Sequence, residues 1–116
     1  MKTIIAGMRD FHDYAFVEPY LGMRPPEIAG VVSGCATGID SLGERWAKAN
    51  GIPIRRFPAD WSKHGKAAGP IRNRQMADYA DALIAFWDRK SKGTKNMIET
   101  AKKSKMKVHI FHTGLD

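Results

Sequence analysis

Hydrophobic residues along this chain fall in short runs that are separated by segments of helical spacing. Five runs rich in apolar and β-branched residues are predicted strands: Lys2–Ala6, Ile28–Ser33, Ile52–Phe57, Ala82–Trp87 and Lys107–Phe111. The fourth run, Ala-Leu-Ile-Ala-Phe-Trp, is apolar at every position. Such a run is typical of a central parallel strand, because helices cover both of its faces.

The segments between these runs predict four helices: Asp13–Gly22, Ile39–Asn50, Pro70–Tyr79 and Thr94–Ser104. In the predicted helix Ile39–Asn50, Asp40 can cap the first turn and Gly51 follows the last turn. Pro19 fits poorly inside the predicted helix Asp13–Gly22, so we expect that helix to be kinked or to begin late. Strands and helices alternate, which predicts an α/β fold, a Rossmann-like three-layer sandwich with a five-stranded parallel sheet, in one domain over residues 1–116.

Composition narrows the class of protein further. The single cysteine, Cys35, excludes an internal disulfide, and the four scattered histidines have no metal-ligand spacing, so we expect no metal and no cofactor. No stretch approaches the ~20 apolar residues of a membrane span. The N-terminal run is too short for a signal peptide, and we therefore expect a cytoplasmic protein without membrane contact.

The net charge of +7 is concentrated in one segment. Residues 89–107 hold eight lysines and arginines and a single acidic residue, Glu99, whereas the two signs balance in the rest of the chain. One interpretation is a solvated, lysine-rich outer helix. The other is a basic face that binds nucleic acid weakly and without sequence preference.

The loops at one edge of the predicted sheet have an unusual composition. In a parallel sheet of this kind, ligands bind beyond the carboxyl ends of the strands. Four loops reach that edge: Gly7–Asp10, Ser33–Gly38, Asp60–Gly69 and Asp88–Gly93. Glycines let backbone N–H groups approach a phosphate, but none of these loops matches the Gly-x-Gly-x-x-Gly or P-loop pattern.

Arg72 stands out at the start of the third predicted helix. It falls in the same arc as Ile71, Met76 and Tyr79, so it cannot be plain core. An arginine at a helix N-terminus opposes the helix dipole and needs an anion, a carboxylate partner or solvent. The anion would be a bound ligand, and the carboxylate would be a structural one such as Asp40, Asp60 or Asp88. The nearby Trp61 either stacks on a base or anchors a lid.

Five stretches carry motifs in a specific order and spacing: Gly7–Tyr14, Val32–Asp40, Phe57–Trp61, Gly65–Met76 and Gly93–Asn96. Together they resemble the SLOG superfamily, close to its YspA/YpsA-related branch, over residues 1–112. The resemblance implies a homodimer and a nucleotide or nucleotide-derived ligand. We therefore expect a nucleotide-binding sensor, carrier or sequestering protein.

The loops at the sheet edge, the position of Arg72 and this resemblance together indicate the expected ligand contacts. Arginines would neutralise phosphate, loop residues would supply backbone or hydroxyl contacts, and Asp10 or Asp40 would accept from ribose hydroxyls. The full predicted set is Gly7, Arg9, Asp10, Ser33, Gly34, Gly38, Asp40, Trp61, Arg72, Asn73, Arg74, Gly93, Thr94 and Asn96.

Two groups of relatives imply different alternatives. Lonely-guy phosphoribohydrolases cleave nucleoside monophosphates, and their helix arginine matches Arg74, but their catalytic glutamate falls on Asn96 here. Arg74 and Glu99 are the remaining catalytic candidates, and an amide cannot act as the general base. The DNA-processing protein DprA handles single-stranded DNA, and its loop resembles Ser33–Asp40. The enzyme and DNA-binding interpretations stay open beside simple ligand binding.

Overall fold

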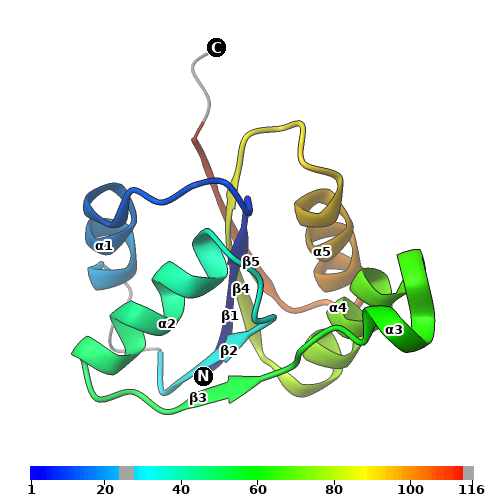
Figure 1. Cartoon of the computed structure of the whole chain (residues 1–116). Coiled ribbons are helices and arrows are strands. Elements are labelled where there is room, and N and C mark those ends of the chain that lie inside the picture. The colour runs from blue at the N-terminus through cyan, green and yellow to red at the C-terminus, as the bar shows by residue number, and fades with distance from the viewer. Residues whose placement is uncertain (24–27, 114–116) are drawn as a thin grey trace.

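The sheet of this protein is parallel throughout. The computed structural model describes residues 1–23 and 28–113. Its strands are β1 (Lys2–Gly7), β2 (Gly30–Ser33), β3 (Ile54–Arg56), β4 (Ala82–Trp87) and β5 (Lys107–His112). They pair in the order β3-β2-β1-β4-β5 (Figure 1). The predicted five-stranded parallel α/β fold is confirmed.

Helices cover both faces of the sheet and complete the three layers. Helices α1 (Tyr14–Gly22) and α2 (Ile39–Ala49) lie on one face, and α4 (Ala68–Tyr79) and α5 (Lys92–Lys103) lie on the other (Figure 1). Successive strand residues alternate between the two cores because side chains along a strand point to opposite faces. In β1, Ile5 packs with α1 and α2, whereas Ile4 packs with α4 and α5.

Two glycines bring α2 close to the central strand. A Cβ on Gly43 would lie 2.8 Å from the Ile5 side chain, which is closer than van der Waals contact allows. A Cβ on Gly7, the last residue of β1, would lie 2.7 Å from Ile39 at the start of α2. The absence of these side chains allows the first turn of α2 to sit directly beside the carboxyl end of β1.

The segment before α4 differs from the prediction. A short helix, α3 (Trp61–His64), and a 3-10 turn, η2 (Gly65–Ala67), precede α4, which begins at Ala68 rather than Pro70. Asp60 caps α3, accepting from the Lys63 N–H at 3.1 Å. A four-residue helix has no apolar period, so its sequence gave no signal.

Two expectations about helix starts were wrong. Ile71 is not part of the core arc of α4, since 36% of it is exposed, while the buried positions include Asn73, Met76 and Ala77. Asp40 does not cap α2. The cap position is Gly38, and the Asp40 carboxylate instead accepts from the Ala36 N–H before the helix.

The helix around Pro19 begins one residue later than predicted. Asp13 is its cap residue and accepts from the Phe16 N–H at 3.3 Å, and the helix continues through Pro19. None of the helices within residues 1–23 and 28–113 has the length and apolar character needed to span a bilayer.

The order of the strands creates a switch point in the middle of the sheet. The chain adds β2 and β3 on one side of β1 and then crosses to add β4 and β5 on the other side. The loops after β1 and β4 therefore leave the sheet toward opposite faces, which opens a crevice between them.

Candidate functional site

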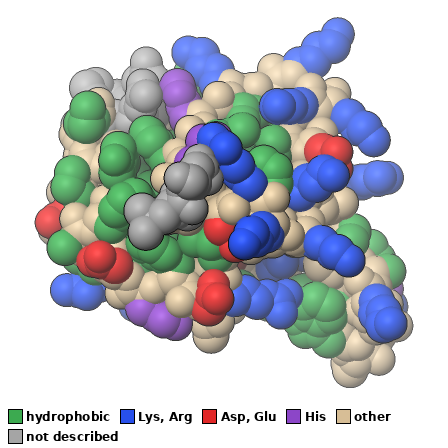
Figure 2. All heavy atoms as spheres, turned by 90° about the horizontal axis from the view of Figure 1, so that it is seen from above, with side chains coloured by type: hydrophobic (Ala, Val, Ile, Leu, Met, Phe, Trp, Pro, Cys, Tyr) green, Lys and Arg blue, Asp and Glu red, His purple; other side chains and the backbone are tan. Residues whose placement is uncertain are grey.

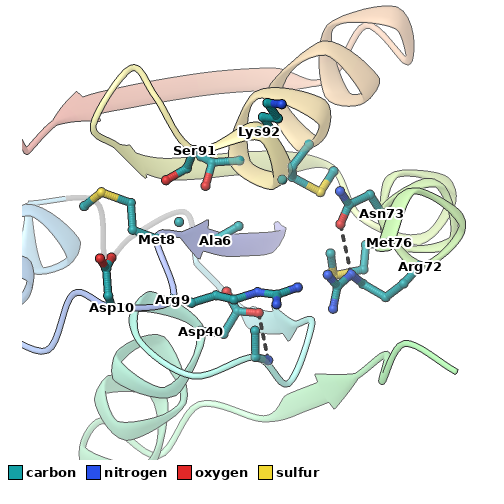
Figure 3. A pocket seen from close by; sticks show the side chains of 15 residues that line it. Ala6, Met8, Arg9, Asp10, Asp40, Arg72, Asn73, Met76, Ser91 and Lys92 are labelled. Carbon is teal, nitrogen blue, oxygen red and sulfur yellow. Dashed lines mark hydrogen bonds between the residues drawn. The ribbon is translucent and has the colours of Figure 1, made fainter. Parts of the chain in front are cut away.

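A cavity of about 300 Å³ lies at this switch point. The β1–α1 loop, the start of α2, the start of α4 and the start of α5 all contribute to its wall (Figure 3). Its lining residues are 6–10, Ala36, Asp40, Arg72, Asn73, Met76, 91–94 and Met97. This volume is at the lower end of the range of small-molecule sites.

A second cavity of about 390 Å³ adjoins the first. The two share Arg9, Ala36 and Arg72, and the second adds residues of the β2–α2 loop and Trp61 from α3. Trp61 is 49% exposed, and the Arg9 guanidinium carbon lies 5.4 Å from the centre of its ring. An aromatic face is thus available beside the cationic wall that the two cavities share.

The guanidinium groups of Arg9 and Arg72 point toward one another in the wall that the two cavities share (Figure 3). Figure 3 shows the side chains of Arg9 and Arg72 converging from different elements. Arg72 donates to the Gly34 carbonyl and, at 2.9 Å, to Asn73 Oδ1. Burial, together with the charge of Arg9, lowers the pKa of Arg72, and Asp40 opposes that shift. Two cations this close favour a bound anion between them.

The structural ion pair considered for Arg72 is not formed by the described part of the chain. The one side-chain ion pair there joins Arg56 Nη2 to Glu44 Oε1 at 2.9 Å. Asp60 caps α3, and Asp88 accepts from backbone N–H groups of its own turn. Asp40 acts on Arg72 through its charge, without a direct contact.

Asp40 is a buried carboxylate in the wall of the first cavity. It is 5% exposed and accepts a hydrogen bond from the Ala36 N–H at 3.2 Å (Figure 3). Burial raises its pKa to about 6, although the Ala36 N–H and Arg72 both favour the charged form. The cavity therefore contains a carboxylate whose charge changes around pH 6.

The first turn of α5 forms the opposite wall. Asp88 holds this turn by accepting from the N–H groups of Lys90 and Ser91, both at 2.8 Å. Ser91 is the cap residue, and its side chain makes no capping hydrogen bond. Gly93 and Thr94 follow it along the cavity wall. Free N–H groups at a helix start attract anions.

The β2–α2 loop is tied to the β1–α1 loop. The Ile39 N–H donates to the Met8 carbonyl at 3.1 Å, and the Thr37 hydroxyl donates to the Arg9 carbonyl at 3.0 Å. Gly38 has a φ of 74°, and a Cβ there would collide with the Met8 carbonyl oxygen. Gly38 is thus needed for the approach of the two loops and does not line either cavity.

Ser33 also has a supporting position. Its hydroxyl donates to Glu44 Oε2 at 2.6 Å and accepts from the Cys35 N–H at 3.1 Å. Burial alone would raise the pKa of Glu44, but the hydrogen bonds from Ser33 and Arg56 outweigh it and lower that pKa. Burial, with a further contribution from Glu44, raises the pKa of the Cys35 thiol, which is the opposite of an activated nucleophile.

The structure brings most of the predicted site residues together. Those that line the first cavity are Gly7, Arg9, Asp10, Asp40, Arg72, Asn73, Gly93 and Thr94. Gly34 and Trp61 line the second. Five candidates line neither cavity: Ser33, Gly38, Arg74, Asn96 and Glu99.

The outlying candidates have identifiable positions. Arg74 and Glu99 are exposed on α4 and α5. Asn96 Oδ1 accepts from Asn73 Nδ2 at 2.9 Å, so this amide is engaged by the neighbouring helix. The sequence interpretation missed Ser91 and Lys92 because α5 was expected to begin at Thr94, two residues after its actual start.

The fold and this site define the class of protein: a Rossmann-like α/β domain with a cationic cavity at the switch point of its sheet. Residues 1–64 match the family described as YspA, cpYpsA-related SLOG. The chain belongs to this family, which confirms the resemblance inferred from the motifs.

Similarity to individual proteins extends over nearly the whole chain. The chain is 34% identical to the Gene 61 protein of Mycobacterium phage D29, over 95% of both proteins. It also superposes on the crystal structure of DNA processing protein A (DprA) from Streptococcus pneumoniae with a TM-score of 0.78 and 20% identity. That match covers 94% of this chain and 49% of DprA, and it establishes a shared fold.

The raised pKa of Asp40 predicts a pH-dependent stability. An unfolded aspartate has a pKa of 3.8, so the folded state binds a proton more tightly, and the cost of the buried charge grows as pH rises from about 4 through 6. At 1.36 kcal/mol per unit, this cost is roughly 3 kcal/mol at pH 8. Asp40→Asn should raise the free energy of unfolding at pH 8 by about 1–3 kcal/mol and should lose this gain toward pH 4.

Urea denaturation across this pH range measures the effect. Asp10→Asn is the matched control, because Asp10 lines the same cavity but is exposed, and its stability should follow that of the unaltered chain. An Asp40→Asn variant that is less stable than the unaltered chain at pH 8 would show that attraction to Arg72 outweighs burial.

Proposed function

We propose that this protein binds a nucleotide or a nucleotide-derived molecule across the two adjoining cavities. The observation that carries the proposal is the pair of guanidinium groups of Arg9 and Arg72, which face one another on the shared wall. Membership of the SLOG family supports it, because the resemblance to that superfamily implies a nucleotide or nucleotide-derived ligand.

The chemistry of the walls suggests how such a ligand would lie. Phosphate would occupy the first cavity, between the two arginines and the first turn of α5, where Gly93 and Thr94 offer backbone N–H groups. The base would lie in the second cavity against the half-exposed ring of Trp61. Lys92, which also lines the first cavity, adds a third positive charge.

A binding protein with this site would act as a sensor, carrier or sequestering protein. We extend the proposal to a homodimer, which the family resemblance implies. Ile71 is the exposed large apolar residue on α4, and it is a candidate for the contact. Light scattering that reports a monomer would remove the dimer without affecting the ligand proposal.

The phosphate contact can be tested by charge removal. Arg72→Ala should weaken binding by about 1.5–3 kcal/mol, the range of hydrogen bonds to charged groups. Native mass spectrometry of protein purified without denaturation would identify any ligand that copurifies. Calorimetry with AMP, GMP, CMP and UMP would then measure the affinity of each variant.

Arg74→Ala is the matched control for this measurement. Arg74 lies two residues along the same helix, is exposed and lines neither cavity, so its removal should leave affinity unchanged. Equal affinity of the unaltered and Arg72→Ala proteins would contradict the assignment. An equal loss in both variants would point to long-range charge and not to a contact.

The phosphoribohydrolase alternative depends on position 96. Asn96 lines neither cavity, and its side chain is hydrogen-bonded to Asn73. We expect the unaltered protein to release little free base from nucleoside monophosphates, because an amide cannot act as a general base. Chromatography of the incubated nucleotides measures this, with Asn96→Glu as the variant that restores a carboxylate. Rapid base release by the unaltered chain would favour the enzyme.

A basic face favours single-stranded DNA binding as a second candidate function. The eight lysines and arginines of residues 89–107 are all exposed. Figure 2 shows Lys and Arg side chains gathered over the half of the molecule that holds α4 and α5. The structural similarity to DprA gives this candidate a precedent, although the chain spans only about half of that protein.

Salt dependence separates a solvated surface from a specific DNA site. If the lysines are ordinary surface, binding to an oligothymidine strand should be weak and should fall steeply with salt concentration. Fluorescence anisotropy measures this, with a Lys102/Lys103/Lys105 triple-alanine variant for comparison. Tight binding that persists at physiological salt, and that the triple variant loses, would establish DNA binding as the main function.

A further inference from the structure

Asp40 is an unexpected residue for a cavity that binds anions. Two arginines and the start of a helix attract negative charge there, yet a carboxylate stands in the same wall. Among the described residues, its one hydrogen-bond donor is the Ala36 N–H, which contacts Oδ2. Arg72 directs its hydrogen bonds elsewhere, to Gly34 and Asn73.

The second oxygen of this carboxylate therefore has no donor from the described chain. Among the described residues, the Tyr14 hydroxyl is the one fully buried side-chain polar atom without a partner, so this carboxylate oxygen meets the open space of the cavity. Asp40 as a whole is 5% exposed, and its carboxylate lies against the cavity beside the Arg9 side chain (Figure 3). The missing donor would have to come from the contents of the cavity.

The position of Asp40 along the two cavities indicates which part of a ligand would supply that donor. The Asp40 carboxylate accepts from the N–H of Ala36, which lines both cavities. It also lies close to Gly34 in the wall of the second cavity, since a Cβ built on Gly34 would be 2.9 Å from Asp40 Oδ2. Asp40 is thus located at the junction of the cavities. In the proposed arrangement, phosphate lies on one side of this junction and the base on the other, which leaves the sugar between them.

We infer that Asp40 accepts a hydrogen bond from a ribose hydroxyl and so selects ribonucleotides over nucleotides that lack these hydroxyls. The inference rests on the proposed function and names the class of ligand that the site takes. A hydroxyl donor would compensate the buried carboxylate, whereas a dideoxy sugar would leave it without a partner and next to an anion. Asp40 would then determine specificity, while Arg9 and Arg72 supply affinity.

The test compares matched ligands on the unaltered chain. Calorimetry at pH 7.5 would use the four ribonucleoside 5′-monophosphates and their 2′,3′-dideoxy counterparts. The ribonucleotide that binds should bind about tenfold or more tightly than its dideoxy counterpart, as expected for a hydrogen bond to a charged group. The 2′-deoxy compound would then identify which hydroxyl is contacted.

Variants distinguish this role from a structural one. In Asp40→Asn the preference should fall to within about twofold, because the charged acceptor is lost while the Ala36 N–H keeps an acceptor oxygen. In Asp78→Asn, which alters an exposed carboxylate of α4 that lines neither cavity, the preference should remain. A carboxylate that only stabilises the loop would alter both affinities together and leave their ratio unchanged.

The outcomes separate this inference from the proposed function. Equal affinity for the ribose and dideoxy compounds on the unaltered chain overturns the role of Asp40 and leaves nucleotide binding standing. Binding of none of the nucleotides overturns both. The comparison on the unaltered chain decides the inference even if Asp40→Asn fails to fold, and circular dichroism reports whether it folds.

Discussion

The site depends on one buried carboxylate beside two converging guanidinium groups. Without Asp40, the β2–α2 loop would lose the acceptor for its Ala36 N–H, and Arg9 and Arg72 would lose the buried negative charge that acts on both. The arrangement is not the most stable one for the folded chain, since burial raises the pKa of Asp40 to about 6. Unfavourable electrostatics of this kind are concentrated where proteins bind or react.

The fold places this carboxylate through close backbone contacts. Gly7 and Gly43 let α2 approach β1, and Gly38 lets the loop before α2 approach the Met8 carbonyl. Each contact leaves no room for a side chain, so the first turn of α2 is fixed beside the end of the central strand. Because β4 lies on the other side of β1, the start of α5 faces the same crevice. Rigid elements therefore hold all of the charged groups in the first cavity except those of the β1–α1 loop.

The sequence was informative about this architecture and less so about which side chains face the cavity. Apolar runs identified the five strands because each buried strand needs both faces covered, and β4 was located at its observed bounds. Arg72 could be singled out from its position in a helical arc. The arc itself was misplaced, however, since Ile71 is exposed and Asn73 is buried. Which residues of a helix face the core depends on tertiary packing, and a ten-residue pattern with two arginines does not determine that packing.

The same limit explains the residues that motif spacing grouped with the site but that line neither cavity. Ser33 and Gly38 lie in the expected loop, yet one supports Glu44 and the other permits a close backbone approach. Asn96 lies on α5 between the lining residues Thr94 and Met97, and Asn73 holds its amide. A motif shows which residues occur together and does not separate ligand contacts from the residues that position them.

In this protein the positioning residues form a connected network of hydrogen bonds. Asn73 donates to Asn96, Arg72 donates to Asn73, and Arg72 also donates to the Gly34 carbonyl. The orientation of the Arg72 guanidinium thus depends on residues of α4, α5 and the β2–α2 loop. A change at Asn96 would therefore alter the proposed phosphate contact through that orientation, although Asn96 lines neither cavity.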